Sequence, residues 1–341
     1  MYSLSKGEVS QMKICLYLEF EDLLRCSGIG TAIRNQRRAL ELNNVEYTNN
    51  LDEDFDIIHL NIIGLKSLYL AKIMKRRGKK VILHAHVTAD DFRNSYRFSN
   101  EIAPILRRCL TFYYNQADLV LCPSNYTKGV LERAGVKKPI RVISNGIDTE
   151  KFHFSERKRR RFRETYELDG IVPMNVGHLF LRKGLRTFVR VAKEFMDKEF
   201  IWVGRRYRRL EDPEVKRIIE NSPENVRFLD YIEDIVAAYS GTDIFFFPSL
   251  CENQGIVLLE AAACKRPLLV RDLEVYENWL EDGVNCLKAR NDREFKEKLE
   301  LLIEDENLRN RIADNAFKMS QKHSLRNIGA RLKEIYEELL C

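Results

Sequence analysis

The sequence lacks any apolar run near the roughly 20 residues that a membrane-spanning helix needs. Its first residues, MYSLSKGEVSQ, include no apolar core of the kind found in signal peptides. We therefore expect a cytoplasmic protein. Residues 1–11 are expected to form a disordered tail, or to come from an upstream start codon read in place of Met12.

The sequence also lacks a CxxC pair. Several of its eight cysteines lie in apolar, strand-like contexts, which indicates reduced, buried thiols and not a disulfide framework or a zinc site. Cys251 has no nearby histidine to activate it, so packing is favoured over a nucleophilic role. The cysteines are Cys15, Cys26, Cys109, Cys122, Cys251, Cys264, Cys286 and Cys341.

The composition excludes both a disordered chain and a small disulfide-stapled one. Of the 341 residues, 45% are apolar, so the chain can bury one or two sizeable cores. At roughly 150 residues per domain, this length predicts about two domains.

Basic residues exceed acidic ones, 57 against 51, and the excess is concentrated in two segments. Lys72–Lys80 (KIMKRRGKK) holds six bases and no acid, and Glu156–Arg163 (ERKRRRFR) holds six bases and one acid. Without them, 45 bases face 50 acids, a balance of −5. The two segments therefore predict an anionic partner, which could be nucleic acid, a membrane surface or a phosphorylated ligand.

Short β-branched runs alternate with helical patterns in two successive halves, which predicts parallel sheets covered by helices on both faces. Two such halves indicate twin Rossmann-like domains, with ligands bound at the carboxyl ends of the strands, in the crevice between them. The expected strands are Lys13–Glu19, Ile57–Asn61, Val81–His84, Leu119–Cys122, Ile140–Ile143, Pro173–Val176, Phe200–Val203, Val226–Phe228, Ile244–Phe247 and Pro267–Val270. The expected helices are Thr31–Leu42, Leu65–Arg77, Ser99–Asn115, Tyr126–Ala134, Lys183–Phe195, Glu214–Asn221, Ile232–Ser240, Asn253–Ala263 and Leu325–Leu340.

Two strand ends in the first half carry candidate binding residues. Gly28 and Gly30 open a helix, and glycines at a helix N-terminus let backbone amides approach a phosphate. Because the pattern is not GxGxxG, a tight turn is the favoured interpretation of these glycines alone. After another strand come His84 and His86. We expect their side chains to point to opposite faces, one packing and one reaching the crevice, which makes them a poor metal pair.

Two further loops are less specific. Asn145 to Asp148 (NGID) is typical of a turn. In the second half, the loop from Gly177 to Gly184 places Arg182 and Lys183 just before a helix. Two cations in such a loop can clamp a diphosphate, and a solvated basic turn is the alternative.

The strongest feature runs from Phe247 to Glu260 (FPSLCENQGIVLLE). A strand ends at Pro248 and a helix is expected to start near Asn253, with Gly255 in its first turn, so the amides there could hold an anion. Glu252 and Glu260 could bind hydroxyls at either end of a sugar nucleotide. Two glutamates eight apart are usually surface residues, and it is the ordered combination with the other motifs that favours a site.

Taken in order, these motifs resemble those of the retaining glycosyltransferases of the GT-B fold, the large family-4 class. The likeness covers nearly the whole chain. It is closer still to bacterial glycolipid synthases that add glucose or galactose to diacylglycerol or monoglucosyl-diacylglycerol. The matching positions are Gly28, Gly30, His86, Asn145 to Asp148, Arg182-Lys183-Gly184, and Glu252 with Glu260 as an E-x7-E motif.

The resemblance implies a GT-B architecture with two domains facing across a cleft. Residues 12–165 with the C-terminal helix at 323–341 would form the acceptor and membrane domain, and residues 166–322 the nucleotide-sugar domain. Glu260 would bind the ribose of a UDP donor, and Glu252 the transferred sugar. The diphosphate would be held by the backbone of Gln254, Gly255 and Ile256 and by the charges of Arg182 and Lys183. The rest of the donor site would be formed by Gly28, Gly30, His86 and Asn145.

The family further implies a retaining, metal-independent hexosyltransferase that uses a UDP-sugar as donor substrate and no other cofactor. Front-face attack is expected, because no side chain is an evident nucleophile. The expected product is a glycolipid of the lipoteichoic-acid anchor type, with glucose favoured over galactose. Three departures put the sugar specificity in doubt: the arginine next to the lysine at Arg182, Asn253-Gln254 in place of Thr-Glu, and Ala85 in place of Gly. His178 is left without a role.

A membrane partner is expected from the first half. The helix at 99–116 carries apolar residues beside Arg107 and Arg108, and it follows the Lys72–Lys80 segment. Such a helix could bind anionic headgroups. The alternative is a core-packed helix with a solvated basic face. The sequence alone favours this alternative, whereas the resemblance favours membrane binding. The family implies a peripheral protein on the inner face of the cell membrane.

Other functions remain open at this point. The same enzyme class could act on a polysaccharide, a teichoic acid or a protein. A nucleic-acid-binding protein would explain the basic segments, but the chain has no RNP aromatics, zinc spacing or recognition-helix motif, so no nucleic-acid partner is expected. A non-catalytic sugar-nucleotide binder is disfavoured by the intact Glu252, Glu260 and Lys183. The oligomeric state is not predicted.

Overall fold

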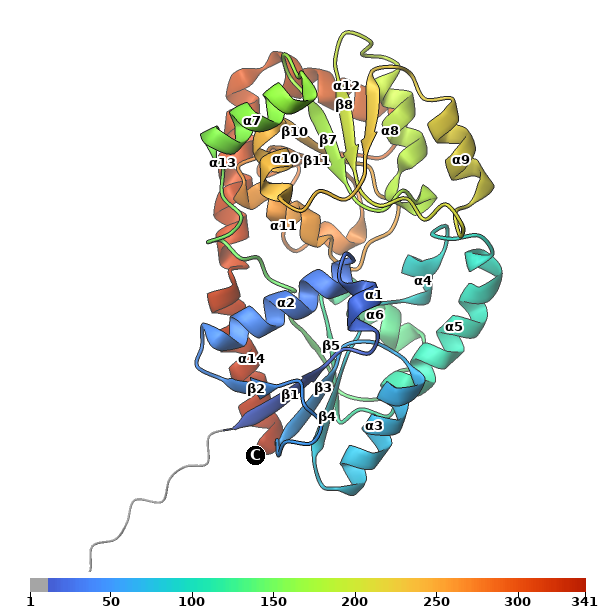
Figure 1. Cartoon of the computed structure of the whole chain (residues 1–341), viewed down its shortest axis with the longest axis vertical. Coiled ribbons are helices and arrows are strands. Elements are labelled where there is room, and N and C mark those ends of the chain that lie inside the picture. The colour runs from blue at the N-terminus through green and yellow to red at the C-terminus, as the bar shows by residue number, and fades with distance from the viewer. Residues whose placement is uncertain (1–11) are drawn as a thin grey trace, which may run out of the picture.

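The computed structural model describes residues 12–341 and contains two parallel sheets of six strands each (Figure 1). The tail expected at residues 1–11 lies outside the described residues. The first sheet has the order β2-β1-β3-β4-β5-β6, formed by β1 (Lys13–Tyr17), β2 (Glu46–Thr48), β3 (Ile57–Leu60), β4 (Lys80–His84), β5 (Leu119–Cys122) and β6 (Ile140–Val142). The second has the order β12-β11-β10-β7-β8-β9, formed by β7 (Pro173–Val176), β8 (Phe200–Val203), β9 (Val226–Leu229), β10 (Ile244–Phe247), β11 (Leu268–Arg271) and β12 (Leu287–Ala289).

Helices cover both sheets, and the central strands are buried along their whole length, as continuous apolar runs require. The first half contains α1 (Glu21–Leu24), α2 (Gly28–Glu41), α3 (Leu65–Arg76), α4 (Ala89–Phe92), α5 (Ser99–Tyr114) and α6 (Asn125–Arg133). The second contains α7 (Glu156–Tyr166), η1 (Leu181–Lys183), α8 (Leu185–Ala192), α9 (Pro213–Glu220), α10 (Ile235–Gly241), α11 (Ile256–Ala263), η2 (Glu274–Tyr276), α12 (Asp292–Glu304) and α13 (Glu306–Lys322). The two-domain α/β prediction is confirmed.

The last helix, α14 (Leu325–Leu340), returns to the first domain, as predicted. It follows α13 along one side of the molecule and packs against α2 (Figure 1). Its buried face, which includes Leu332 and Tyr336, belongs to the same core as Ile14 and Ile82 of the first sheet. The crossing back to the first domain is fixed by a parallel bridge between Ile147 and Ser324.

Several element boundaries differ from the expected ones. Helix α2 begins at Gly28, three residues early, because Ser27 accepts a hydrogen bond from the Gly30 amide and caps it. The helix expected to start at Asn253 begins only at Ile256, because Gly255 has a φ of 86° and ends the preceding loop. The helix expected over 183–195 is divided by Gly184, whose φ of 81° separates η1 from α8. The edge strands β2 and β12 and the helices α12 and α13 were not predicted.

The second basic segment forms α7, a helix that was not among the expected elements. Its only buried side chain, Phe162, packs in the core of the second domain with Tyr239. The boundary expected at residue 165 therefore falls inside a helix of that domain, and we propose a boundary just before Glu156. Among residues 12–341, no helix combines the length and the apolar character needed to cross a bilayer.

Candidate functional site

The carboxyl ends of the two sheets meet, because loops that follow β4 and β6 contact the loop that follows β10. This last loop runs from Pro248 to Gly255 and contains four buried polar residues, Ser249, Glu252, Asn253 and Gln254. The positive φ of Gly255 then allows α11 to start with its amides facing the loop. The site predicted at the strand ends is thus assembled from both domains.

Gln254 joins the second domain to the end of β6. Its side-chain oxygen accepts hydrogen bonds from the backbone amide and the side chain of Asn145, at 3.0 and 2.9 Å, and its amide donates to Ser144 at 2.6 Å. Asn35 of α2 donates to the backbone oxygens of Asn145 and Gly146. Asn145 and Gln254, both predicted as donor-binding residues, here contact each other and hold the two domains together.

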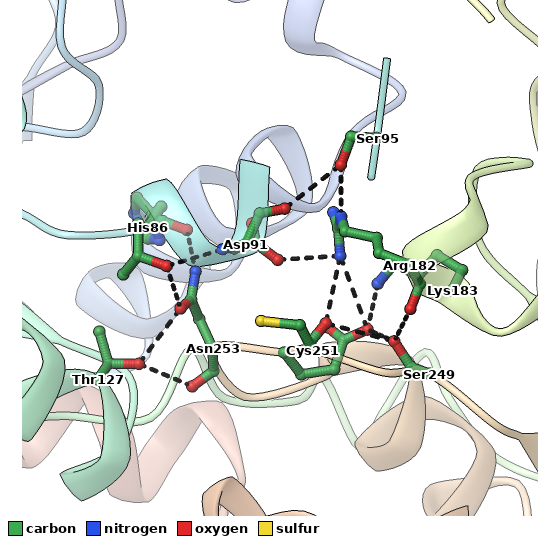
Figure 2. A network of polar contacts seen from close by, with 11 residues as sticks. His86, Asp91, Ser95, Thr127, Arg182, Lys183, Ser249, Cys251 and Asn253 are labelled. Carbon is green, nitrogen blue, oxygen red and sulfur yellow. Dashed lines mark hydrogen bonds and ion pairs between the residues drawn. The ribbon is translucent and has the colours of Figure 1, made fainter. Parts of the chain in front are cut away.

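Asn253 makes a second set of contacts between the domains (Figure 2). Its side-chain amide donates to the backbone oxygen of His86 at 3.0 Å, and its side-chain oxygen accepts from Thr88 at 3.2 Å. Thr127 of α6 donates to its backbone oxygen at 3.2 Å. The two residues noted in the sequence as departures from relatives, Asn253 and Gln254, are therefore interdomain contacts.

Arg182 and Lys183 lie together at the domain junction (Figure 2), and both are within ion-pair distance of Glu252. Lys183 forms an ion pair with Glu252, and Ser249 donates to the same carboxylate at 2.6 Å. Arg182 forms an ion pair with Asp91 at 2.9 Å and donates to Ser95 at 2.7 Å, so it reaches across to the first domain. Two cations and two carboxylates thus alternate at the domain junction.

The charges in this cluster shift one another. Burial alone would raise the pKa of Glu252, but the adjacent Lys183 and Arg182 hold that pKa below its usual value. The pKa of Asp91 is raised, because burial outweighs the attraction of Arg182 and Lys183. Burial opposes the charge of Arg182, yet Asp91 and Glu252 raise the pKa of its guanidinium. The charges of the cluster therefore compensate one another. A bound anion could replace Glu252 and Asp91 as the partner of Lys183 and Arg182.

Glu260 lies on α11 and is buried, with an exposed fraction of 6%. Tyr239 donates a hydrogen bond to one of its oxygens at 2.8 Å, and we find no second hydrogen bond to this carboxylate among residues 12–341. Burial raises the pKa of Glu260, and the charges of Lys151 and of Arg34 on α2 oppose that shift. Glu260 therefore keeps an acceptor oxygen for a hydroxyl group, with cations from outside α11 nearby.

The two predicted glycines differ in what surrounds them. A Cβ on Gly30 would lie 2.3 Å from the backbone oxygen of Leu24, so α1 packs against α2 too closely for any side chain there. A Cβ on Gly28 would meet no atom within 4 Å. Both residues lie in the first turn of α2 and not in a loop. Gly30 is thus required by packing, and Gly28 leaves open space at the start of the helix.

The expectation that His84 and His86 point to opposite faces is wrong. Their rings stack with centroids 4.0 Å apart and 9° between planes, because alternate residues of an extended strand share a face. His59 of β3 stacks on the other side of His84, with centroids 5.3 Å apart. The result is a row of three imidazoles that begins in the core and ends at His86, beside the domain junction.

Hydrogen bonds determine the tautomers in this row. The Gln36 amide can only donate, so the Nδ1 of His84, at 2.9 Å, accepts. The Nε2 of His59 lies 3.2 Å from the same atom, and its Nδ1 lies 2.8 Å from the Tyr336 hydroxyl. His86 lies 3.0 Å from the side-chain oxygen of Asn61, which can only accept, so His86 donates through Nε2. Burial lowers the pKa of His59 and of His86 to about 3, and that of His84 well below its usual value.

His178, left unassigned by sequence, packs against Phe180 and Tyr207, with ring centroids 5.4 and 5.1 Å away. Burial, followed by the charges of Lys183 and Arg182, lowers its pKa to about 4. Its Nδ1 is buried and has no hydrogen-bond partner among residues 12–341. A neutral imidazole thus lies next to the cation pair.

Sequence reasoning missed the first-domain side of the cluster. Asp91, Ser95 and Thr88 belong to the short α4 region that follows His86. Two adjacent acids after the His-Ala-His strand end were a visible signal. Arg182, the ion-pair partner of Asp91, is 91 positions away in sequence. Only the docking of the two domains brings them together.

The comparisons with known proteins agree with this geometry. Residues 28–151 match the family described as Glycosyltransferase Family 4, and residues 156–319 match Glycosyl transferases group 1. The chain is 36% identical over 335 residues to the processive diacylglycerol alpha-glucosyltransferase of Acholeplasma laidlawii, covering 96% of this chain and 99% of that protein. It is 27% identical to the alpha-galactosylglucosyldiacylglycerol synthase of Streptococcus pneumoniae, over 73% of this chain and 68% of that protein.

Solved structures share the fold. HepE of Anabaena, in complex with UDP and glucose, superposes with a TM-score of 0.75 at 19% identity, over 96% of this chain and 100% of that one. Sucrose-phosphate synthase from Thermosynechococcus elongatus gives a TM-score of 0.79 at 14% identity, over 96% and 99%.

Proposed function

Since the chain belongs to the family-4 glycosyltransferases of the GT-B fold, we propose that it transfers a hexose from a UDP-sugar to diacylglycerol or monoglucosyl-diacylglycerol, with retention of configuration. Glucose is the favoured sugar, on the strength of the relative from Acholeplasma laidlawii. The observation that carries the proposal is the convergence of Arg182, Lys183 and Glu252 at the domain junction, with Glu260 on the adjoining helix.

The donor would replace contacts that the protein now makes with itself. Lys183 and Arg182 each hold a carboxylate, Glu252 and Asp91 respectively, in the position that a diphosphate anion would take. Backbone amides of Gln254, Gly255 and Ile256 at the start of α11 would add donors to the same anion. Glu260 would accept hydrogen bonds from the ribose hydroxyls, and Glu252, released from Lys183, from the transferred sugar.

The same groups account for catalysis. Negative charge gathers on the leaving UDP as the sugar becomes oxocarbenium-like, and fixed cations and helix amides stabilise that charge without reorganising. Exclusion of water strengthens each of these interactions. His86, which is neutral and donates to Asn61, would use its remaining nitrogen to accept from a sugar hydroxyl. Front-face attack by the acceptor hydroxyl retains the configuration and requires no enzymic nucleophile.

The acceptor would come from a membrane bound by the first domain. Helix α5 divides its apolar residues: Leu110 and Tyr113 are buried, and Ile102, Ile105 and Phe112 are exposed by 46, 65 and 54%. Core packing therefore explains only part of its apolar surface. The same two helices also carry basic residues, which comprise Arg107 and Arg108 on α5 with Lys66, Lys72 and Arg76 on α3.

Helices α3 and α5 form one candidate docking face, because Lys72 lies 5.7 Å from the ring centroid of Phe112. Leu65 and Tyr69 on α3 add exposed apolar surface, at 87 and 61%. Each basic residue near an anionic surface contributes about 1 kcal/mol, and the apolar side chains add their burial. This supports a peripheral protein on the inner face of the cell membrane.

A donor-by-acceptor screen tests the proposal. UDP-glucose and UDP-galactose are each offered with diacylglycerol and with glucosyl-diacylglycerol in mixed vesicles, and UDP release and lipid product are measured. Lipid glycosylation by either donor is expected. If sugar is transferred only to a polysaccharide, a teichoic acid or a protein, the proposed lipid acceptor is wrong. If the protein binds DNA and releases no UDP, the proposed enzyme class is wrong.

Two variants test the site itself. Lys183→Ala and Glu260→Ala should each lower kcat/KM by about 10²- to 10³-fold, because each removes a charged contact to the donor. Lys193→Ala, an exposed lysine just after α8, is the matched control and should leave the rate unchanged. Far-ultraviolet circular dichroism checks the fold. Near-wild-type turnover in either active-site variant would contradict the residue assignment.

A further inference from the structure

A second charged cavity lies at the opposite end of the second sheet from the candidate donor site. It has a volume of about 300 Å³ and is lined by residues from α7, α13 and the turns that precede β10 and β11. Asp243 and Arg266 come just before these strands, whereas Pro248 and Glu252 follow β10. A four-residue strand spans about 13 Å, so the two sites are separated by about the length of β10.

The lining carries more positive than negative charge. Lys265, Arg266 and Arg309 all line the cavity, and none of them forms an ion pair with a carboxylate of residues 12–341. The acidic lining residues are Asp243 and Glu306. Four cations (Arg159, Lys265, Arg266 and Arg309) against two carboxylates leave a net charge of +2 around the cavity, which favours an anion from outside the chain.

Asp243 offers no free oxygen to these cations, because both of its oxygens already accept hydrogen bonds from other groups. One accepts from Arg159 at 2.7 Å, and the other from Arg163 at 3.2 Å and from the amide of Val172 at 2.9 Å. Both arginines belong to α7, the second of the two basic segments of the sequence. Two positive charges of that segment are therefore neutralised by a carboxylate within the second domain.

The remaining arginines are held in place by neutral groups. Arg266 donates to the backbone oxygens of Cys264 and Thr242, at 3.1 and 2.6 Å, and its guanidinium lies 5.0 Å from the ring centroid of Phe154. Arg309 donates through one nitrogen to the backbone oxygens of Leu302 and Ile303. These bonds fix the guanidinium groups and leave a terminal nitrogen of each without a hydrogen bond to any residue between 12 and 341. Burial lowers the pKa of Arg266 to about 10, and the charge of Asp243, which opposes this shift, offsets only part of it.

We propose that this cavity binds a phosphate group, as a site separate from the sugar-nucleotide site. Arginine forks and a lysine are the side chains that recognise phosphate oxygens. A volume of about 300 Å³ lies at the lower end of small-ligand sites, which suits a phosphate with a small attached group. The group can be carried by a soluble ligand or by the headgroup of an anionic lipid. Because the ligand would join α7 and α13 to the sheet, its binding stabilises the second domain.

Thermal unfolding of the full chain tests the proposal, with potassium phosphate titrated against potassium chloride at matched ionic strength. At ten times the dissociation constant, phosphate should raise the unfolding midpoint of the wild type by about 4 °C beyond chloride. Lys265→Gln/Arg309→Gln should lose that rise, and each single variant should lose part of it. Arg266 is left intact, because its carbonyl contacts support the turn before β11.

Two controls separate other effects. Arg311→Gln/Lys318→Gln removes two charges from exposed positions of α13, outside the cavity, and should keep the rise. Lys183→Gln should also keep it, which distinguishes this cavity from the diphosphate clamp. A rise that is equal in the cavity variant and the wild type, or that is lost only in Lys183→Gln, would overturn a soluble phosphate site.

Vesicle flotation distinguishes the source of the phosphate. If a headgroup occupies the cavity, Lys265→Gln/Arg309→Gln should bind phosphatidylglycerol vesicles at least tenfold more weakly than the charge-matched control, with phosphatidylcholine vesicles unaffected. A phosphate-dependent midpoint with unchanged vesicle binding assigns a soluble ligand. If the cavity variant matches its control in both assays, no phosphate site exists.

Discussion

The row of three buried imidazoles makes the first domain sensitive to acid. His59, His84 and His86 have lowered pKa values in the folded protein, about 3 for the first and last, whereas a histidine in an unfolded chain titrates near 6.5. Below pH 6.5 the unfolded chain therefore binds protons that the folded domain does not. Stability is complete above pH 6.5 and is lost as the pH falls from there toward 3.

The size of this effect follows from proton linkage. Lowering the pH from 7 to 5 costs about 2 kcal/mol of unfolding free energy for each such histidine, or about 6 kcal/mol for three. This is comparable with the whole stability of many domains, about 5–15 kcal/mol. Asp91 and Glu260, whose pKa values are raised, act in the opposite direction. A variant that removes one imidazole isolates the histidine contribution from these carboxyl groups.

Hydrogen exchange of amides in β3 and β4 measures the opening free energy of this core at each pH. The wild type should lose about 2 kcal/mol more than His59→Asn between pH 7 and 5, although the variant is less stable at pH 7. The fluorescence of Trp202 and Trp279, both in the second domain, serves as an internal comparison with a smaller loss. Equal pH dependence in wild type and variant would refute the assignment of neutral, buried rings.

Three further outcomes are expected. Gly30→Ala should lower the free energy of unfolding measured in urea by about 1–3 kcal/mol, because its Cβ would overlap a backbone oxygen. Gly28→Ala is the control and should be neutral or slightly stabilising. Equal effects of the two substitutions would contradict the packing of α1 against α2. Gln254→Leu should leave buried Asn145 groups unsatisfied at about 1–3 kcal/mol each and increase the radius of gyration measured by small-angle scattering; an unchanged radius would mean that other contacts hold the domains. Ile105→Glu should weaken flotation with anionic vesicles at least tenfold, whereas Leu301→Glu, 50% exposed on the second domain, should not; equal losses would point to charge alone.

Much of the site could be predicted, because strand ends are recognisable from local pattern. The loop from Pro248 to Gly255, the clamp residues Arg182 and Lys183, and Glu260 were all found from residue type and order, and the structure brings them to one junction. Their catalytic roles stay a prediction. Asp91 escaped notice, because its significance depends on an ion pair with the other domain.

The histidine pair shows where pattern reasoning failed. The two rings were expected on opposite faces, whereas period-two geometry places them together, and the third ring comes from a neighbouring strand that has no sequence relation to the motif. The second basic segment is similar. Its charges suggested an external partner. Two of its arginines, Arg159 and Arg163, instead share the buried carboxylate of Asp243, which lies in the turn before β10.

The sequence by itself determined the alternation of strands and helices, the two-domain α/β architecture, the family and the order of the chemical groups. These features depend on local periodicity and short-range spacing, which a single chain displays directly. The tertiary structure alone decided which charges face each other. The row of neutral imidazoles, the Asn253 and Gln254 contacts, and the cations around the second cavity each combine segments that lie far apart in sequence. Their desolvation and pairing are set by the way the two domains and the last two helices pack.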